Sequence, residues 1–95
     1  MRFEWDQAKN RLNRKKHGVS FEVAREVFAD PFCLTIHDQT IEGTDRYWTI
    51  GRVAKLVILV VVHTVTDEEG AEVIRIISAR KATPRERTFY EEVDK

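Results

Sequence analysis

Basic side chains gather in the last third of the chain, where they would meet a negatively charged partner. The segment VIRIISARKATPRERTFY, residues 73–90, holds one acid, Glu86, and five bases: Arg75, Arg80, Lys81, Arg85 and Arg87. A second basic run, KNRLNRKK at residues 9–16, holds no acid. The whole chain is neutral, with 16 basic and 16 acidic residues, so these clusters are local. They indicate a polyanionic partner, of which nucleic acid is the commonest in cells.

Phosphodiester cleavage is a reaction that such residues can support. It builds negative charge on the non-bridging oxygens, which fixed guanidinium groups stabilise. One proton must leave the attacking hydroxyl and another must reach the leaving oxygen, roles that His63 or Tyr90 can serve. RNA brings its own 2′-hydroxyl nucleophile, so neither a metal nor a protein nucleophile is required, and no cofactor is expected.

Structural interpretations compete with these roles. A histidine that closes an apolar strand is commonly a packed, hydrogen-bonded residue. Arginines at strand ends, such as Arg46 and Arg75, are commonly solvated or paired in salt bridges. Glu86 follows Thr83 and Pro84, and this pattern is a helix-capping box, so we assign Glu86 a structural role.

The elements that position these residues are helices first and strands afterwards. Residues 3–5 form a candidate edge strand. Asp6 caps a helix to about Lys16, which Gly18 ends, and Ser20 caps a second helix, which ends at Asp30-Pro31. Four β-prone runs follow, CLTIHD, RYWTIGRV, KLVILVVVHTV and EVIRIISA, and then a helix from Thr83. The prediction is an α+β domain with a small antiparallel meander, flanked by two N-terminal helices and one C-terminal helix.

Alternation along the strands predicts which side chains share a face. Thr35, His37, Tyr47, Thr49 and Arg75 form a polar set. Apolar neighbours are expected under the helices: Leu34, Ile36, Trp48, Ile50, Ile74 and Ile76. Tight hairpins would gather one neighbourhood at one sheet end: His37, Arg46, Tyr47, His63 and Arg75. Arg80 would lie nearer the opposite end, and Arg46 has the parity of the apolar face.

Length and composition narrow the class of protein. With 95 residues, the chain is expected to be a single domain over residues 1–95. No apolar run approaches the ~20 residues of a membrane helix, and the N-terminus does not resemble a signal peptide. Cys33 is alone, and we interpret it as a buried thiol in a reducing cytoplasm.

Several strings together resemble the BrnT toxins of bacterial type II toxin–antitoxin pairs. They are FEWDQAKNRLNRKKHGVSFEVAREVFADP, RYWTIGRV, VVVHT and RIISARKATPRERTFYE, in the family's order and over nearly the whole chain. The resemblance implies the RelE-like microbial ribonuclease fold and a toxin that cleaves RNA and inhibits translation. It also implies a BrnA-type ribbon–helix–helix antitoxin in a 2:2 complex, which contacts operator DNA mainly through the antitoxin.

Carried over position by position, the resemblance emphasises Arg46, Arg80 and Tyr90. Where relatives often carry tyrosine before a threonine, this chain has His63 before Thr64, which leaves the general base open. The predicted catalytic residues are therefore Arg46, His63, Arg80 and Tyr90. The predicted RNA-binding residues are Arg75, Tyr47, Lys16 and Lys81.

Two other functions compete with an endoribonuclease. The first two helices, joined by HGVS, superficially resemble a DNA-binding helix–turn–helix. However, the second helix is apolar and acidic where a major-groove reader needs hydrogen-bond donors. The other alternative is a catalytically inactive interaction protein.

Overall fold

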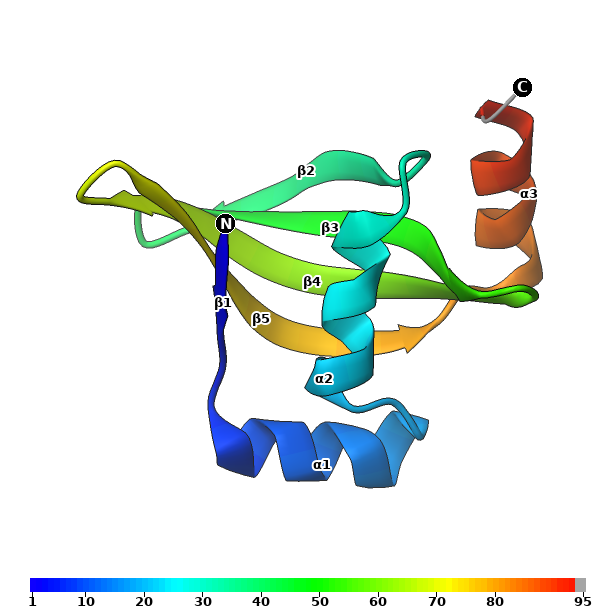
Figure 1. Cartoon of the computed structure of the whole chain (residues 1–95), viewed down its shortest axis with the longest axis horizontal. Coiled ribbons are helices and arrows are strands. Elements are labelled where there is room, and N and C mark those ends of the chain that lie inside the picture. Colours follow the sequence, from blue (N-terminus) through cyan, green and yellow to red (C-terminus); the bar gives the residue numbers. More distant parts are fainter. Residues whose placement is uncertain (94–95) are drawn as a thin grey trace.

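A single five-stranded sheet organises residues 1–93, which the computed structural model describes (Figure 1). Its strands are β1 (Arg2–Glu4), β2 (Leu34–Ile41), β3 (Thr44–Ala54), β4 (Val57–Glu68) and β5 (Ala71–Lys81), in the order β1-β5-β4-β3-β2. The predicted antiparallel meander is found in β2 to β5. The sheet as a whole is mixed, because β1 pairs with β5 in parallel. The prediction of an α+β domain is confirmed, and that of a wholly antiparallel sheet is wrong.

Two hairpins make the strands longer than the sequence predicted. Glu42-Gly43 joins β2 to β3, and Glu69-Gly70 joins β4 to β5. All four residues have positive φ, at 49° and 79° in the first turn and 54° and 82° in the second. Two-residue turns with positive φ match the natural twist of the flanking strands. Asn-Gly is the usual sequence signal for such a turn. The Glu42-Gly43 turn lacks this signal, so the sequence did not predict it.

The helices begin where the sequence predicted. In α1 (Gln7–His17), Asp6 accepts a hydrogen bond from the Lys9 amide, and Gly18 ends the helix at φ 72°. In α2 (Phe21–Ala24), Ser20 accepts from the Val23 amide. The second helix does not continue as α-helix to Asp30, because η1 (Arg25–Ala29) is a 3-10 helix. None of the helices in the described residues is long and apolar enough to cross a membrane.

The last helix, α3 (Pro84–Val93), has the predicted capping box. The Glu86 amide donates to Thr83 Oγ1 at 3.2 Å, and the Thr83 amide donates to Glu86 Oε1 at 2.9 Å. These reciprocal bonds satisfy amides that have no partner within the helix.

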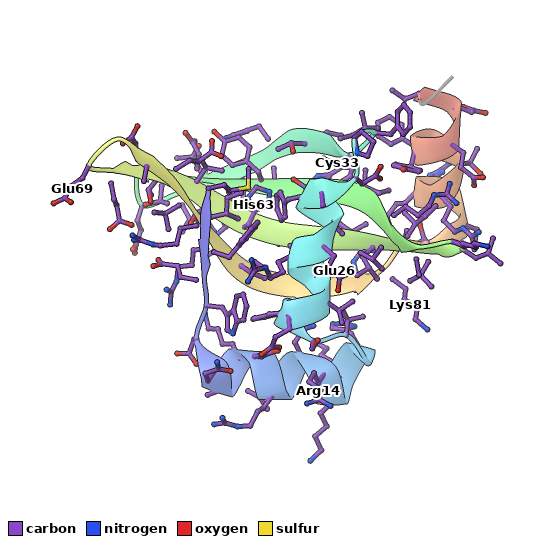
Figure 2. The ribbon with its side chains drawn as sticks, viewed as in Figure 1. Arg14, Glu26, Cys33, His63, Glu69 and Lys81 are labelled. Carbon is purple, nitrogen blue, oxygen red and sulfur yellow. The ribbon has the colours of Figure 1, made fainter. Side chains whose placement is uncertain are left out.

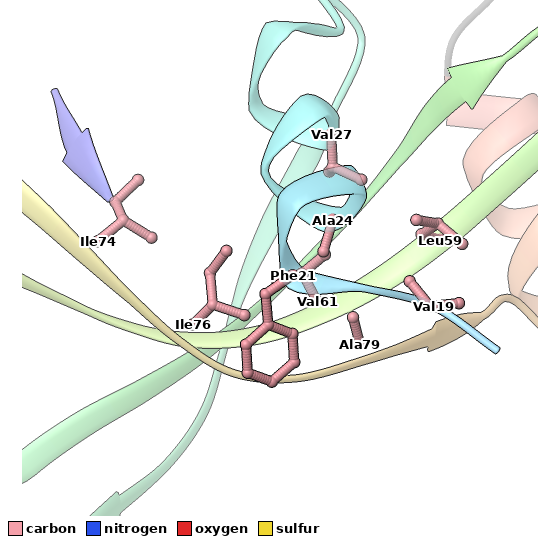
Figure 3. Close-up of a cluster of buried hydrophobic side chains, with 9 residues drawn as sticks. All are labelled: Val19, Phe21, Ala24, Val27, Leu59, Val61, Ile74, Ile76 and Ala79. Atoms are coloured by element: carbon pink, nitrogen blue, oxygen red, sulfur yellow. The ribbon is translucent and has the colours of Figure 1, made fainter. Parts of the chain in front are cut away.

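Two apolar layers cover the sheet from opposite sides. The larger layer joins α2 and η1 to β4 and β5 through Val19, Phe21, Ala24, Val27, Leu59, Val61, Ile74, Ile76 and Ala79 (Figure 3). The smaller layer places Tyr90 of α3 on Ile50, Ile58 and Val60. The middle of β4 is therefore covered on both faces, as its unbroken apolar sequence predicted. Gly51 permits the close approach of η1, since a Cβ there would lie 2.9 Å from Val27 Cγ1.

The predicted assignment of the two faces was wrong. Thr49 is fully buried on the α2 and η1 side, where it pairs with Val61 across β3 and β4. Leu34, Trp48 and Ile50 lie on the opposite side and contact the α3 layer. Alternation grouped the residues of β2 and β3 correctly, but it does not state which face each helix covers. In β5 the predicted sets are exchanged, because Ile74 and Ile76 lie on the face of Thr49 and Arg75 lies on the other face.

Helix α1 is attached to the sheet by asparagines. Asn13 Nδ2 donates to the Ala79 carbonyl at 2.7 Å, and the Ala79 amide donates to Asn13 Oδ1 at 3.2 Å. Asn10 Oδ1 accepts from the Phe21 amide at 2.8 Å. Both side chains are buried, at 4% and 7% exposed for Asn10 and Asn13. The Asn13 side chain thus satisfies the backbone groups of Ala79 at the free edge of β5, as a neighbouring strand would.

Candidate functional site

Part of the sheet face opposite α1, α2 and η1 is left uncovered beyond α3. We call this region the open face. It carries eight side chains, each half-buried or exposed although most lie in central strands: Glu4, Arg46, Trp48, Val62, Thr64, Arg75, Ser78 and Arg80. Covered positions in the same strands are buried, so α3 shields only one end of this face.

A row of charged and hydroxyl side chains crosses one end of the open face. Arg75 pairs in register with Thr64 of β4 and with Glu4 of β1. Arg46 immediately precedes Tyr47, which pairs with His63, so Arg46 lies beside Thr64. Strand spacing puts the Cα atoms of Arg46 and Arg75 about 10 Å apart. Glu4 Oε1 accepts from Arg75 Nη1 at 3.4 Å, and Arg46 makes no ion pair within residues 1–93.

Arg80 lies toward the other end of β5, as predicted. It lies five positions along the strand from Arg75, or about 15 Å. Its guanidinium makes a two-pronged contact with Glu86, with Nη1 to Oε1 at 2.6 Å and Nη2 to Oε2 at 2.9 Å. This hydrogen-bonded pairing holds the pKa of Glu86 at about 2 and raises the pKa of Arg80. Arg80 is therefore fixed in direction, with 41% of its side chain exposed.

A β-bulge gives β5 its pattern of side chains between these two arginines. Val62 pairs with Ser78 and His63 with Ile76, so Ile77 is the extra residue. The bulge lets Ser78 and Arg75 share the open face although they are three positions apart. Trp48 pairs with Val62 and packs against Phe89 of α3, with ring centroids 6.5 Å apart.

The predicted neighbourhood of five residues is divided between two faces. His37, Tyr47 and His63 lie on the face that carries η1, whereas Arg46 and Arg75 lie on the open face. The Tyr47 ring is 6.0 Å from His63 and 5.5 Å from His37, centroid to centroid. All five residues do occupy the same end of the sheet, but the sheet itself separates the histidines from the arginines.

His63 is a packed residue in this structure. It is 1% exposed and meets the Phe28 ring edge-on at 4.9 Å. Its Nδ1 lies 3.3 Å from the Thr64 carbonyl, which can only accept, so Nδ1 carries the proton. Nε2 then accepts from the Thr49 hydroxyl at 2.7 Å. Burial lowers the pKa of His63, which keeps the ring neutral and out of reach of a substrate.

Tyr90 is also enclosed, at 1% exposed. Its hydroxyl donates to Asp30 Oδ2 at 2.5 Å, and the same oxygen accepts from the Arg52 amide at 2.8 Å. Burial and the Asp30 hydrogen bond raise the pKa of Tyr90. Burial also acts to raise the pKa of Asp30, but the bonds from Tyr90 and the Arg52 and Phe32 amides outweigh it and lower that pKa. The predicted proton donor is thus the anchor that joins α3 to the end of η1.

The remaining predicted residues lie away from the open face. Lys81 pairs with Leu59 of the larger core layer and borders a cleft beside Arg11 and Arg14 of α1. Lys16 is exposed in the last turn of α1. Cys33 is half-buried against the larger core layer, and burial raises the pKa of its thiol.

Sequence reasoning missed three residues of the open face: Glu4, Thr64 and Ser78. Glu4 belongs to the short first strand, and its position beside Arg75 depends on a parallel pairing between distant segments. Thr64 shares the parity of Arg46 once the hairpins are in register. No sequence signal indicates Ser78, because its orientation depends on the bulge.

An open sheet face with arginines at both ends, supported by helices behind, defines a small domain suited to a polyanion. Comparison with known proteins makes this class specific. Residues 5–86 match the family model described as the ribonuclease toxin BrnT of type II toxin–antitoxin systems. The chain belongs to this family.

A solved structure supports the same conclusion. The chain is similar to the Brucella abortus ribonuclease toxin BrnT, whose crystal structure was determined at 1.1 Å resolution. The two share 27% sequence identity with a TM-score of 0.60, over 87% of this chain and 97% of that one. No curated protein sequence matches the chain.

The Arg80–Glu86 pair makes folding stability depend on pH. The pKa of Glu86 falls from 4.5 to about 2 on folding, so the stabilisation is complete above pH 4.5. It is lost as the pH falls from 4.5 toward 2. Because Arg80 is partly exposed, we expect on the order of 1–2 kcal/mol. Glu86→Gln should lower the free energy of unfolding by that amount at pH 7, and by less than half of that amount at pH 3.

Urea unfolding at both pH values measures this difference. Glu91→Gln, on the exposed side of the same helix, is the matched control and should match wild type at each pH. A deficit of Glu86→Gln that stays constant between pH 7 and pH 3 would show that the ion pair is not its cause.

Proposed function

We propose that this protein is a metal-independent endoribonuclease of the RelE-like superfamily that cleaves RNA in the cytoplasm and inhibits translation. The observation that carries this proposal is the open face, where Arg46, Arg75 and Arg80 project from the side of the sheet that the N-terminal helices leave free. The family membership supports ribonuclease activity. The helix–turn–helix alternative has little support, since α2 spans only Phe21–Ala24 and packs onto the sheet.

The arginines would stabilise charge on the phosphate in the transition state. Arg46 is without an ion-pair partner among residues 1–93, so its guanidinium is available to a non-bridging oxygen. Arg80 is oriented by Glu86 and would hold a phosphate of a neighbouring nucleotide, because about 15 Å separates it from Arg75. Guanidinium groups that are oriented before the substrate arrives cost no reorganisation during the reaction.

The proton of the attacking 2′-hydroxyl needs an acceptor on the open face. His63 is buried on the opposite face of the sheet and Tyr90 is buried beneath α3, so we do not carry forward their predicted catalytic roles. Glu4 is the carboxylate of the Arg46–Thr64–Arg75 row, with 43% of its side chain exposed. We assign the role of general base to Glu4, which Arg75 holds in place at 3.4 Å.

Purified protein should cut RNA in the presence of EDTA. Direct attack by the 2′-hydroxyl leaves a 2′,3′-cyclic phosphate and a 5′-hydroxyl, which end-group analysis of the fragments identifies. Arg46→Ala should lower the cleavage rate by roughly 10²–10³ with unchanged stability, the loss typical of one removed transition-state donor. Arg14→Ala is the control, because Arg14 lies on α1 (Figure 2), where it borders a cleft apart from the open face. This variant should cleave at the wild-type rate. Activity that appears only after addition of a divalent metal would contradict the mechanism.

Glu4→Gln tests the general base separately. The amide keeps the size of the side chain but cannot take up the proton, so the cleavage rate should fall by roughly 10²–10⁴. Glu68→Gln is a matched control, since Glu68 is paired with Arg2 at 3.1 Å in a similarly exposed ion pair. If Glu4→Gln and Glu68→Gln cleave equally well, the base is another group.

The partner would be a BrnA-type antitoxin. We propose that an acidic segment of the antitoxin covers the open face, with apolar residues packed against its aromatic rim at Trp48 and Phe89. Its ribbon–helix–helix part would dimerise, which gives a 2:2 complex whose operator contacts are made mainly by the antitoxin.

Association of toxin and antitoxin should slow steeply as salt is raised, because long-range attraction between opposite charges is screened. This salt dependence is tested by measuring association rates for wild type and Arg46→Ala from low to physiological salt. Arg46→Ala should associate more slowly and show a weaker salt dependence. An antitoxin whose association ignores both salt and this substitution binds elsewhere.

A further inference from the structure

A second cationic feature lies between α1 and β5. It is a cleft of about 480 Å³. Four cationic or titratable side chains border it, and two apolar side chains line it: Lys9, Lys15, Lys16, His17, Leu12 and Ile77. Leu12 is 66% exposed, an unusual position for a leucine on a helix that packs against a sheet. We call this feature the lysine cleft.

No acidic side chain lines the lysine cleft, and its lysines form no ion pair within the described part of the chain. Asp6, the residue that caps α1, is an acid influenced by Lys9. Its pKa is lowered chiefly by the hydrogen bond from the Lys9 amide, and also by the charges of Lys9 and Arg75. Lys15, Lys16 and His17 lie in the last turn of α1, where they oppose the negative end of the helix dipole. That partial charge is smaller than the charge of the lysines, so the cleft keeps an excess of positive potential.

The lysine cleft adjoins the open face. Ser78 lines the cleft, and it also stands beside Val62 on the open face. The charges of Lys9 and Arg75 both lower the pKa of Asp6, in agreement with this adjacency. An extended anion bound by Arg46 and Arg75 can therefore continue past Ser78, at the edge of β5, to the lysines of α1.

We propose that the lysine cleft is a second RNA-binding site, which holds the sugar–phosphate backbone of nucleotides flanking the cleaved bond. Lys9 and Lys16 contact phosphates, and Leu12 and Ile77 receive the apolar face of a ribose or base. This inference rests on the proposed ribonuclease function and extends it beyond the open face. The opposite side of α1 differs, because Arg11 and Arg14 border a separate cleft that also contains Glu22.

The two sides of α1 provide a matched experiment. Lys9→Ala/Lys16→Ala removes two cations from the lysine cleft, and Arg11→Ala/Arg14→Ala removes two from the other side. Each variant is titrated with a 20-nucleotide 2′-O-methyl RNA, which cannot be cleaved, at several salt concentrations. The lysine variant should bind about tenfold more weakly, and its plot of log affinity against log salt should be shallower by about 1.4, the effect of two lost phosphate contacts. The arginine variant should bind like wild type, and thermal unfolding checks that both are folded.

Cleavage of an unmodified RNA, measured alongside, separates this inference from the proposed function. If wild type cuts no RNA but the lysine variant still binds less tightly, the proposed nuclease fails and the RNA site stands. If both variants lose affinity equally, only net charge matters and the inference is overturned. The inference is also overturned if the lysine variant keeps wild-type RNA affinity. This holds even if the same variant binds the antitoxin more weakly, because the cleft would then be an antitoxin contact.

Discussion

The attachment of α1 to the free edge of β5 is the constraint on which the rest of the architecture depends. Apolar contacts alone would not fix the position of α1 along β5, because they have no preferred direction. Asn13 fixes this position by hydrogen bonding to both the amide and the carbonyl of Ala79. Asn10 then sets the start of α2 through the Phe21 amide. The cost of burying two amides is met because each finds partners. These hydrogen bonds position α1 and α2 on the sheet. They thereby set the place of the larger core layer and the shape of the lysine cleft.

Local chemistry predicted the beginnings and ends of elements, because caps and strand runs act over a few residues. Asp6, Gly18, Ser20 and the Thr83–Glu86 box all behave as their types require. What local chemistry could not supply was the side of the sheet on which each helix packs. The hydroxyl of Thr49 appeared to belong to a solvated face, yet the chain Thr35–Thr49–His63 satisfies it inside the core. Polar residues that bond one another are hard to distinguish by alternation from exposed ones.

The same limit explains the candidate site. Charge and alternation indicated Arg75, and the family resemblance emphasised Arg46 and Arg80. Their common face follows from register and one bulge. His63 and Tyr90 were chosen for chemistry that they can perform in isolation. In the folded chain both are used for packing, and Asp30 binds the hydroxyl that a proton transfer would need. The carboxylate on the open face instead comes from β1, and its parallel pairing joins the first and last strands of the sequence.

Glu86 serves two structures at once, since the carboxylate that caps α3 also orients Arg80. The two positions are therefore not free to drift independently during evolution. A lineage that replaced Glu86 would loosen the entry of the last helix and release the arginine in a single step. The helix start would then be restored either by reversion of Glu86 or by joint replacement of Arg80 and Glu86. Among related sequences, positions 80 and 86 should consequently change together, and a paired substitution there would mark a rebuilt helix entrance.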